Sequence, residues 1–302
     1  MSKHPVFHSG ELHLQKKSGV NIMADKMSKM MISDSLTDQH QIFFNSLNSL
    51  YIASIDEHGK PWASILVANP GFMNTVDKTH LNIQVNPFSG DKLSENITHN
   101  KHLGLLGLEH HTRRRNRAAG ELVRFNETGM LVKISQAFGN CPKYIQARKI
   151  NILNSINKIT ESDTEVFYQM NDACKKVIEQ ADTFYIASYQ PGEDKPGADI
   201  SHRGGKPGFV KIINKDTLIF DDYSGNNLFM TLGNIASYPY AGLLFIDYKK
   251  NIFWQLQCQA EIIETPDNKH TRQVRLTVNQ VRKLLPELSI KWEFIDYSRF
   301  LP

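Results

Sequence analysis

Short apolar runs, separated by segments rich in Gly, Pro, Asn and Asp, dominate the chain. In the first half these runs are YIASI, WASILVA, HLNIQV and LGLLGL, and in the second half FYIASY, GFVKII, TLIF, GLLFIDY and FWQLQCQAEII. Their β-branched and aromatic residues, and the turn-forming residues that bound them, are typical of β-strands. The pattern predicts a protein built mainly from short strands.

Other segments favour helices. Thr37–Leu50 and Glu165–Ala181 carry apolar residues at the three-to-four spacing of an amphipathic helix. Shorter helical stretches are expected over about Lys92–Thr98 and Asn226–Ile235. Lys149–Thr164 is polar and rich in Asn and Ser, which predicts a connector, although the spacing of its Ile residues also allows a helix.

The two halves contain the same short sequence motifs in the same order. YIAS, PGF, SG, NI and LL each occur twice, at offsets between 134 and 138 residues. So constant an offset indicates two related domains in tandem. We expect an N-terminal extension over residues 1–34, a first domain over 35–150 and a second over 151–302. Many short strands with one or two helices per half favour an antiparallel barrel in each domain.

Composition narrows the class of protein only slightly. With 302 residues, 40% hydrophobic and 22% charged, the chain suits a folded globular protein. Its net charge of +4 suits a small anionic ligand as well as nucleic acid. The three cysteines are far apart, and no run of eighteen apolar residues occurs. We therefore expect a soluble cytoplasmic protein without a disulfide framework or zinc site.

The most informative segment is ADISHRGGKPGFV, residues 198–210. When the two halves are aligned on their PGF motifs, His202 aligns with Ile65 and Arg203 with Leu66. The second half is therefore basic at positions where the first half is apolar. Glycine lets a ligand approach the backbone closely, and an Arg side chain offers paired donors that suit phosphate. The difference predicts a phosphate-bearing ligand in the second domain. The alternative is a charged hairpin turn whose cations are simply solvated.

A second polar segment, DDYSGNN at 221–227, precedes the helix-like run LFMTLGNIA. Asp222 or Ser224 could cap a helix there, and the free N–H groups of its first turn would attract an anion. Thr231 and Asn234 add neutral hydrogen-bonding groups. The alternative is a capping loop that binds no ligand.

Taken in order, these segments resemble the pyridoxamine 5′-phosphate oxidase-like proteins, the FMN-binding split barrels. The resemblance covers nearly all of the second half, through DISHRGGKPGFV, TLIFDDYSGNNLFMTLGNI and AGLLFID. FHSGELHLQKKSGV and GNCPKYIQ also look like segments of one subgroup, while the first half matches more weakly, through its strand pattern and TRRRNRAAGE. The resemblance implies a mainly β (α+β) fold of two tandem split β-barrels with short flanking helices, and non-covalent FMN between barrels.

The resemblance and the polar character of these segments together give the expected cofactor-binding residues. In the second half they are Ser201, His202, Arg203, Gly205, Lys206, Pro207, Gly208, Asp222, Ser224, Asn226, Asn227, Thr231 and Asn234. From the first half we add Arg113 and Arg115, which would share one face of a strand with Arg117 and reach the phosphate from the other barrel. Leu228 departs from the family pattern, because many relatives carry a basic residue there.

The expected function is an FMN-dependent oxidoreductase, with a small-molecule substrate, NADH or NADPH considered as electron donor, and either a homodimer or an intrachain pseudo-dimer. One alternative is a flavin or haem binding protein without turnover. Another is a basic nucleic-acid-binding module built on the arginine run, although that run lacks the interleaved aromatic residues that single strands favour. A solvated edge strand would explain the same arginines.

Other candidate chemistry is weaker. His110 and His111 are adjacent, so their side chains diverge on a strand, and the remaining histidines are scattered; we assign no metal. No nucleophile elbow or P-loop occurs, and no catalytic residue is assigned. Trp254 could cover a flavin ring, but a Trp in such a strand is more often part of the core.

Overall fold

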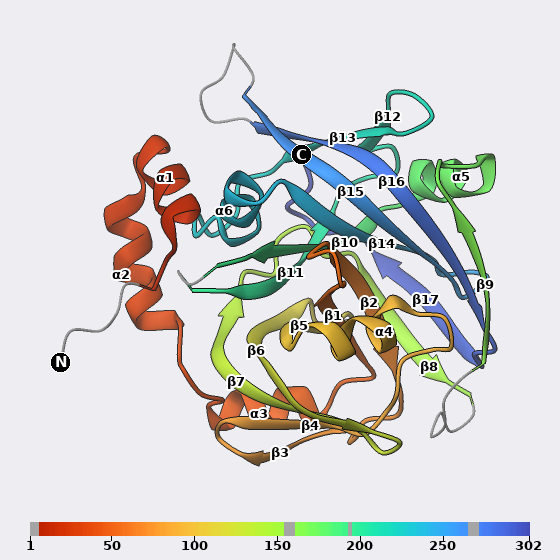
Figure 1. Ribbon diagram of the computed structural model, residues 1–302, viewed down its shortest axis with the longest axis horizontal. Helices are drawn as coiled ribbons and strands as arrows, with labels where there is room; N and C mark the ends of the chain where they lie inside the picture. Colours follow the sequence, from red (N-terminus) through yellow and green to blue (C-terminus); the bar gives the residue numbers. More distant parts are fainter. Residues whose placement is uncertain (1–5, 154–160, 193–194, 265–271) are drawn as a thin grey trace.

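The computed structural model describes residues 6–153, 161–192, 195–264 and 272–302. Its strands form two large antiparallel sheets and one small one (Figure 1). In spatial order the first sheet contains β2 (Pro61–Val67), β1 (Ser49–Ile55), β5 (His102–Glu109), β6 (Arg114–Asn126), β7 (Gly129–Asn140), β4 (His80–Ile83) and β3 (Met73–Asp77). The second contains β11 (Gly197–Gly204), β10 (Thr183–Gln190), β14 (Tyr240–Asp247), β15 (Ile252–Glu264), β16 (Arg272–Pro286), β13 (Thr217–Asp222) and β12 (Val210–Ile212).

The second sheet also contains β9 (Ser162–Phe167), which pairs with β16 and has no counterpart in the first sheet. Apart from β9, the two sheets have the same strand order, so each other strand of one has a counterpart in the other. The registers agree residue by residue: Tyr51 lies opposite Ile65 in the first sheet, and Tyr185 lies opposite His202 in the second. This register places His202 at the position of Ile65, as the repeated sequence motifs indicate. The protein is mainly β and consists of two split β-barrels in tandem.

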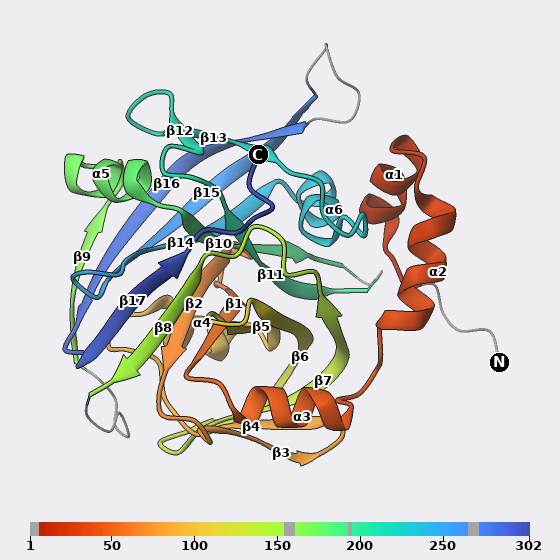
Figure 2. The ribbon, with the colours of Figure 1, turned by 180° about the vertical axis from the view of Figure 1, so that it is seen from behind.

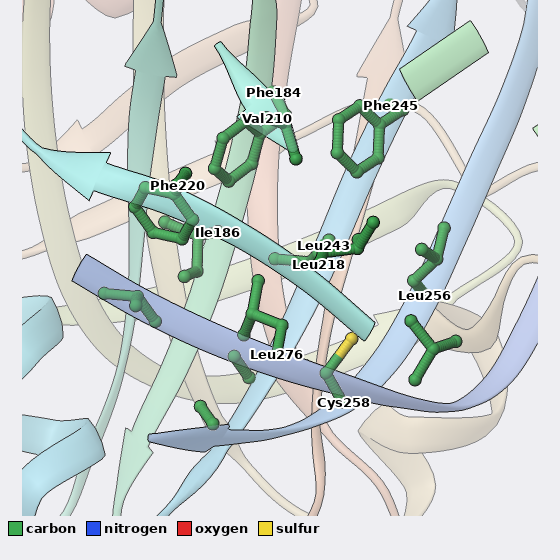
Figure 3. Packing of buried hydrophobic residues seen from close by; sticks show 14 of the residues in the cluster. Phe184, Ile186, Val210, Leu218, Phe220, Leu243, Phe245, Leu256, Cys258 and Leu276 are labelled. Atoms are coloured by element: carbon green, nitrogen blue, oxygen red, sulfur yellow. The ribbon is translucent and has the colours of Figure 1, made fainter. Parts of the chain in front are cut away.

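Each barrel encloses a hydrophobic core of its own. Figure 3 shows the core of the second, where side chains from β10 and from β12 to β16 point toward one another. Trp254 belongs to this core and is 2% exposed. It is therefore an ordinary core residue and does not cover a ligand-binding surface. The first barrel has an equivalent core around residues such as Phe44, Leu50 and Ile52.

A third apolar cluster joins the two barrels. Strands β1 and β10, which contain the two YIAS motifs, are buried along their whole length on both faces. One face of each strand packs into its own core, while Tyr51 and Tyr185 on the other faces stack with ring centroids 3.6 Å apart. The barrels are therefore packed against each other through equivalent strands, as a pseudo-dimer within the chain.

Helices lie around the barrels (Figures 1 and 2). They are α1 (Ser9–Lys17), α2 (Asn21–Met31), α3 (Asp38–Asn45), α4 (Lys92–His99), α5 (Asp172–Gln180) and α6 (Met230–Ser237). The two N-terminal helices lie beside α6 of the second half, although α3, which follows them, lies along β3 and β4 of the first. None of the described helices is both long enough and apolar enough to cross a membrane.

Two helix predictions were too long. Helix α3 begins at its Thr37 cap as expected but ends at Asn45, because Ser49 already pairs in β1. Within Glu165–Ala181, only Asp172–Gln180 is helical and Asn171 caps it. The preceding residues form β9 (Ser162–Phe167), since pairing with β16 outweighs their helical spacing.

The connector between the halves is partly a strand. β8 (Ala147–Ile152) pairs with β17 (Ile290–Asp296) near the C-terminus, so the expected boundary at 150/151 falls inside β8. Residues 154–160 of the predicted connector lie outside the described residues. Its described parts, 149–153 and 161–164, contain no helix, so the helical alternative finds no support there.

Candidate ligand-binding site

A pocket of about 410 Å³ lies where the two halves meet; we call it the arginine pocket. The structure brings nine of the expected cofactor-binding residues to its lining. These are Arg115, Ser201, His202, Arg203, Asp222, Ser224, Asn226, Asn227 and Thr231. Both halves contribute, since Arg115 lies on β6 and the others lie in the second half.

Four arginine side chains line this pocket. Arg115 and Arg117 alternate along β6, Arg203 lies on β11, and Arg272 begins β16. The Nε atom of each of the four is buried and has no hydrogen-bond partner among the described residues. A buried donor left unpaired costs about 1–3 kcal/mol, and more when it is charged. Four such donors around one pocket indicate a ligand with strong acceptors, such as a phosphate.

The carboxylates nearby only partly balance these charges. Asp222 lies 3.4 Å from Nη1 of Arg203, and Asp199 forms an ion pair with Arg117. Burial raises the pKa of Asp222, although the charges of Arg203 and Arg272 act in the opposite direction. The pocket lining therefore keeps an excess of positive charge, which favours an anion.

The arginines also repel one another. Burial, followed by the charge of Arg203, lowers the pKa of Arg115 to about 10. Burial, followed by the charges of Arg115 and Arg203, lowers the pKa of Arg117 to about 9. Both side chains remain protonated at neutral pH, so an anion placed among them would relieve the repulsion.

His202 is the uncharged member of the lining. It is 4% exposed, and burial together with the charges of Arg115 and others lowers its pKa well below the ordinary value. Its Nδ1 atom has no hydrogen-bond partner among the described residues. A neutral imidazole here can accept from or donate to a ligand, depending on its tautomer.

The loop before α6 closes the other side of the pocket. It turns through Asn227 and Phe229, both of which have a positive φ of 59°, while Leu228 between them is fully buried. This geometry delays the helix to Met230, so the predicted start at Asn226 was wrong. Leu228 packs against the N-terminal segment and cannot replace the basic residue of the family pattern.

The expected cap of α6 was also wrong. Phe229 occupies the N-cap position, and no side chain accepts a hydrogen bond from the first turn, so neither Asp222 nor Ser224 caps the helix. Thr231 in that turn lies 2.8 Å from Oγ of Ser201 and donates to Asp199. The start of α6 therefore faces the arginine pocket with uncapped N–H groups, which add to its affinity for anions.

Six expected residues lie elsewhere. Lys206, Pro207 and Gly208 form an exposed turn beyond the end of β11, and Gly205 packs against Phe209. These residues do not line the arginine pocket, and the backbone N–H of Gly205 donates to the carbonyl oxygen of Asp182.

Arg113 and Asn234 are the remaining two. Arg113 is in the turn before β6, with φ of 61°, so it does not share a strand face with Arg115; its side chain donates to Ile145 O and pairs with Asp296. Asn234 is held between Ser188 and His8 and lines a second pocket.

The arginine run is not a surface strand. β6 lies between β5 and β7, so it is not a sheet edge, and Arg115 and Arg117 face inward. Arg114 is the exposed one, with Glu109 4.0 Å away. The run thus offers no continuous basic face of the kind that nucleic acid requires, and the solvated-edge interpretation is wrong for Arg115 and Arg117.

The second pocket, of about 1030 Å³, adjoins the first; we call it the wide pocket. The two share Arg117 and Met230, and α1 and α2 supply one wall of the wide pocket. Its lining carries both signs of charge: the carboxylates are Glu11, Asp25, Asp34, Glu121 and Asp199, and the cations are Lys29, Arg117 and Lys195. Lys29 pairs with Asp25 at 2.6 Å, and Arg117 pairs with Asp199. This lining therefore has no excess of positive charge, in contrast to the arginine pocket.

The equivalent place in the first half is filled. Gln255 holds the position that Arg117 holds in the other sheet, since they lie opposite Leu244 and Leu106. Gln255 is fully buried and donates to Ser64 at 2.9 Å and to Asp91 at 3.1 Å. Ser64 is the counterpart of Ser201, so protein side chains occupy the place that is open in the second half.

The sequence did not single out several lining residues. Arg117 was noted as a neighbour of Arg115, and its spacing of two along a strand was the available signal. Arg272 and Ser18 carried no such signal, because pairing of β15 with β16 and docking of α1 bring them to the pocket. Asn140 ends β7 and Tyr223 follows β13, within the segments GNCPKYIQ and DDYSGNN.

Comparison with known protein families relates part of the chain to one family. Residues 170–290, which run from just before α5 to the first residue of β17, match the family model described as pyridoxamine 5′-phosphate oxidase. This segment, less than half of the chain, is therefore similar to the pyridoxamine 5′-phosphate oxidase family. No curated protein matches the chain.

Solved structures match parts of the chain. An H111A variant of HupZ from Group A Streptococcus is 15% identical, with 37% of this chain and 98% of that chain covered and a TM-score of 0.30. A candidate pyridoxamine 5′-phosphate oxidase from Lactobacillus delbrueckii is 11% identical, covering 38% and 94%, with a TM-score of 0.31. HutZ, the haem storage protein from Vibrio cholerae, is 9% identical, covering 43% and 95%, with a TM-score of 0.27. At these scores the matches say nothing about what this chain binds.

Proposed function

We propose that the protein binds FMN between its two halves and is an FMN-dependent oxidoreductase acting on a small molecule. The observation that carries this proposal is the contrast between two adjoining pockets. The arginine pocket presents four guanidinium groups with unpaired Nε donors, whereas the wide pocket beside it is larger and has no excess of positive charge. A ligand with an anionic end and an uncharged body fits that contrast.

The residues of the arginine pocket suit a phosphate ester. Arg115, Arg203 and Arg272 would hold the phosphate from opposite sides, and the first turn of α6 would add backbone N–H donors. Ser224 and Asn226 offer neutral hydrogen bonds at the same pocket. The pocket draws on both halves, which supports a site within one chain.

The wide pocket suits the ring system. The flavin ring, when bound, supplies the hydride or electron transfer, and the protein supplies placement and electrostatics. Arg117, which lines both pockets, would stabilise negative charge that develops on the ring. The helices α1 and α2 limit access of water from one side, and the remaining space of the wide pocket would admit the substrate.

The proposal is tested by the absorbance spectrum of freshly purified protein and the mass of any chromophore released by heat. We expect flavin bands, the mass of FMN, and loss of the bands in a variant with both Arg115→Ala and Arg203→Ala. A haem band would favour the haem-binding alternative. A colourless protein that also fails to take up added FMN would contradict the proposal.

Oxidoreductase activity needs a second test. With FMN bound, anaerobic addition of NADH or NADPH should bleach the flavin bands, and admission of oxygen should restore them. A protein that keeps its FMN but is reduced by neither donor would be a flavin-binding protein without this turnover. The binding part of the proposal would then stand and the enzymatic part would fall.

A further inference from the structure

The end of helix α1 forms part of the arginine pocket. Ser18 and Val20, just after the helix, line the pocket beside the arginines. The hydroxyl of Ser18 donates to Leu14 O at 2.7 Å and accepts from Nη2 of Arg272 at 2.5 Å. A residue from the N-terminal segment thus touches one of the four arginines directly.

The guanidinium of Arg272 contacts two protein groups, and its Nε donor is left unpaired among the described residues. Its guanidinium lies 5.0 Å from the ring centroid of Phe229, and its Nη2 donates to Ser18. The side chain is 7% exposed, and its Nε has no hydrogen-bond partner among the described residues. This arrangement fixes the direction of the guanidinium and leaves a buried donor at the pocket.

The N-terminal helix docks on the same loop and helix that close the pocket. Gln15 donates to Leu228 O at 3.0 Å, and Nε2 of His8 lies 2.9 Å from Oδ1 of Asn234. Gly10 packs so closely on α6 that an added Cβ would lie 2.2 Å from the carbonyl oxygen of Gly233. Docking of α1 and the shape of the pocket are therefore coupled through residues 228–234.

We propose that the N-terminal segment, residues 6–20, is a working part of the ligand site. Arg272 binds the ligand's phosphate, and Ser18 is the positioning residue that holds Arg272 toward it. Ligand binding and docking of α1 then stabilise each other, because each favours the same placement of Arg272. The inference rests on the proposed function only in taking the ligand to be a phosphate ester.

Comparison of FMN with riboflavin, which lacks the phosphate, tests the role of Arg272. Titration followed by flavin fluorescence should show Arg272→Ala weakening FMN binding about 10- to 100-fold while leaving riboflavin binding unchanged. The matched control is Arg275→Ala, which removes an exposed arginine of the same strand that pairs with Glu261 at 3.0 Å. Equal FMN affinity in Arg272→Ala and wild type, or an equal loss for both flavins, would overturn the inference.

The positioning role of Ser18 has its own rescue test. Ser18→Ala should weaken FMN binding by a smaller factor than Arg272→Ala, and Ser18→Thr, which keeps a hydroxyl, should restore it. Riboflavin binding should not change in either variant. If Ser18→Thr is as weak as Ser18→Ala, or if riboflavin follows FMN, Ser18 has only a structural role.

Protection of the segment from trypsin tests the coupling in the opposite direction. FMN should slow cleavage after Lys16 and Lys17 in the wild type but not in Arg272→Ala, and riboflavin should give no protection. Gly10→Ala, which disturbs docking without touching the pocket lining, should speed cleavage and weaken FMN binding together. Cleavage that FMN does not affect in the wild type would contradict the coupling.

Failure of the proposed function can be told apart from failure of this inference. If the wild type binds neither flavin, inorganic pyrophosphate serves as the probe for the same protection experiment. Protection by pyrophosphate that Arg272→Ala abolishes would uphold the inference with a different phosphate ligand. Absence of protection by pyrophosphate as well would overturn it.

Discussion

Arg117 on the first sheet forms an ion pair with Asp199 on the second, at the point where the two pockets meet. Asp199 also accepts a hydrogen bond from Thr231 in the first turn of α6, at 3.0 Å. One carboxylate therefore connects a strand from each half with the helix that faces the arginine pocket. The site is a product of both halves, and neither barrel contains it alone.

Removing a pocket arginine should weaken binding more than removing the exposed lysine nearby. Arg203→Ala should reduce the affinity for FMN by roughly 1.5–3 kcal/mol, the scale of a hydrogen bond to a charged group. Lys206→Ala should leave the affinity unchanged, since Lys206 is exposed in the turn beyond β11. Calorimetric titration gives both values. The site assignment fails if Lys206→Ala has the larger effect.

Each chain should bind a single FMN. The counterpart site is filled by Gln255, which is hydrogen-bonded to Ser64 and Asp91, so it has no room for a second flavin. Titration of apo-protein at a concentration well above the dissociation constant should reach its end point at one equivalent per chain. An end point at two equivalents would show that the first half has kept a site.

Stability should fall as the pH is lowered below neutral, because of buried neutral histidines. Burial, followed by the charge of Arg148, lowers the pKa of His110 from 6.5 to about 3, and its ring lies 2.8 Å from the hydroxyl of Tyr51. Between these values the unfolded chain binds a proton that the folded chain does not. The contribution is complete above about pH 6.5 and is lost as the pH falls toward 3, with a slope of about 1.4 kcal/mol per pH unit per histidine.

Denaturant unfolding between pH 7 and pH 5 measures this slope. His202 acts in the same direction, since its pKa is also lowered. His110→Gln keeps a hydrogen-bond partner for Tyr51 and should have a shallower pH dependence than the wild type. His58→Gln, a change at an exposed histidine, is the control. An unchanged slope in His110→Gln would mean that this histidine is not buried in its neutral form.

A buried ion pair should be important for joining the halves. Arg148 on β8 donates to Asp182 at 2.6 Å, and both residues are less than 10% exposed. Asp182→Ala leaves the arginine buried without its partner and should cost roughly 3–5 kcal/mol of unfolding free energy. The exposed pair of Lys283 with Glu165 is the comparison, where Glu165→Gln should cost less than about 1 kcal/mol. Equal effects would mean that water reaches the Arg148 pair.

The sequence predicted those parts of the fold and site that depend on local pattern. The apolar runs located β1, β2, β4 and β5 of the first half and β10, β12, β13, β14 and β15 of the second, but not β3, β7, β16 or β17. The offset of the PGF motifs placed His202 at the position of Ile65. The basic residues of β11 were a direct signal of a ligand site. The equivalent strand β2 has apolar residues at the same positions, so the fold itself does not require basic ones. That signal led to Arg203 and to the residues beside it.

Features set by distant contacts were not predictable in the same way. The turn that contains Lys206 carried the same basic character as Arg203, yet the direction of the chain after β11 takes it away from the pocket. Helix α6 begins late because Leu228 is drawn into a cluster with the N-terminal segment. Arg272 reaches the pocket through strand pairing with β13 and contact with Ser18, and neither relationship leaves a pattern along the chain.

The most direct test of the central claim is a crystal structure of the protein with FMN. The account predicts one flavin per chain, with its phosphate within hydrogen-bonding distance of Arg115 from the first half and Arg203 from the second, and its ring in the wide pocket. A flavin bound outside the junction of the halves, or a phosphate held by residues of one half alone, would contradict it.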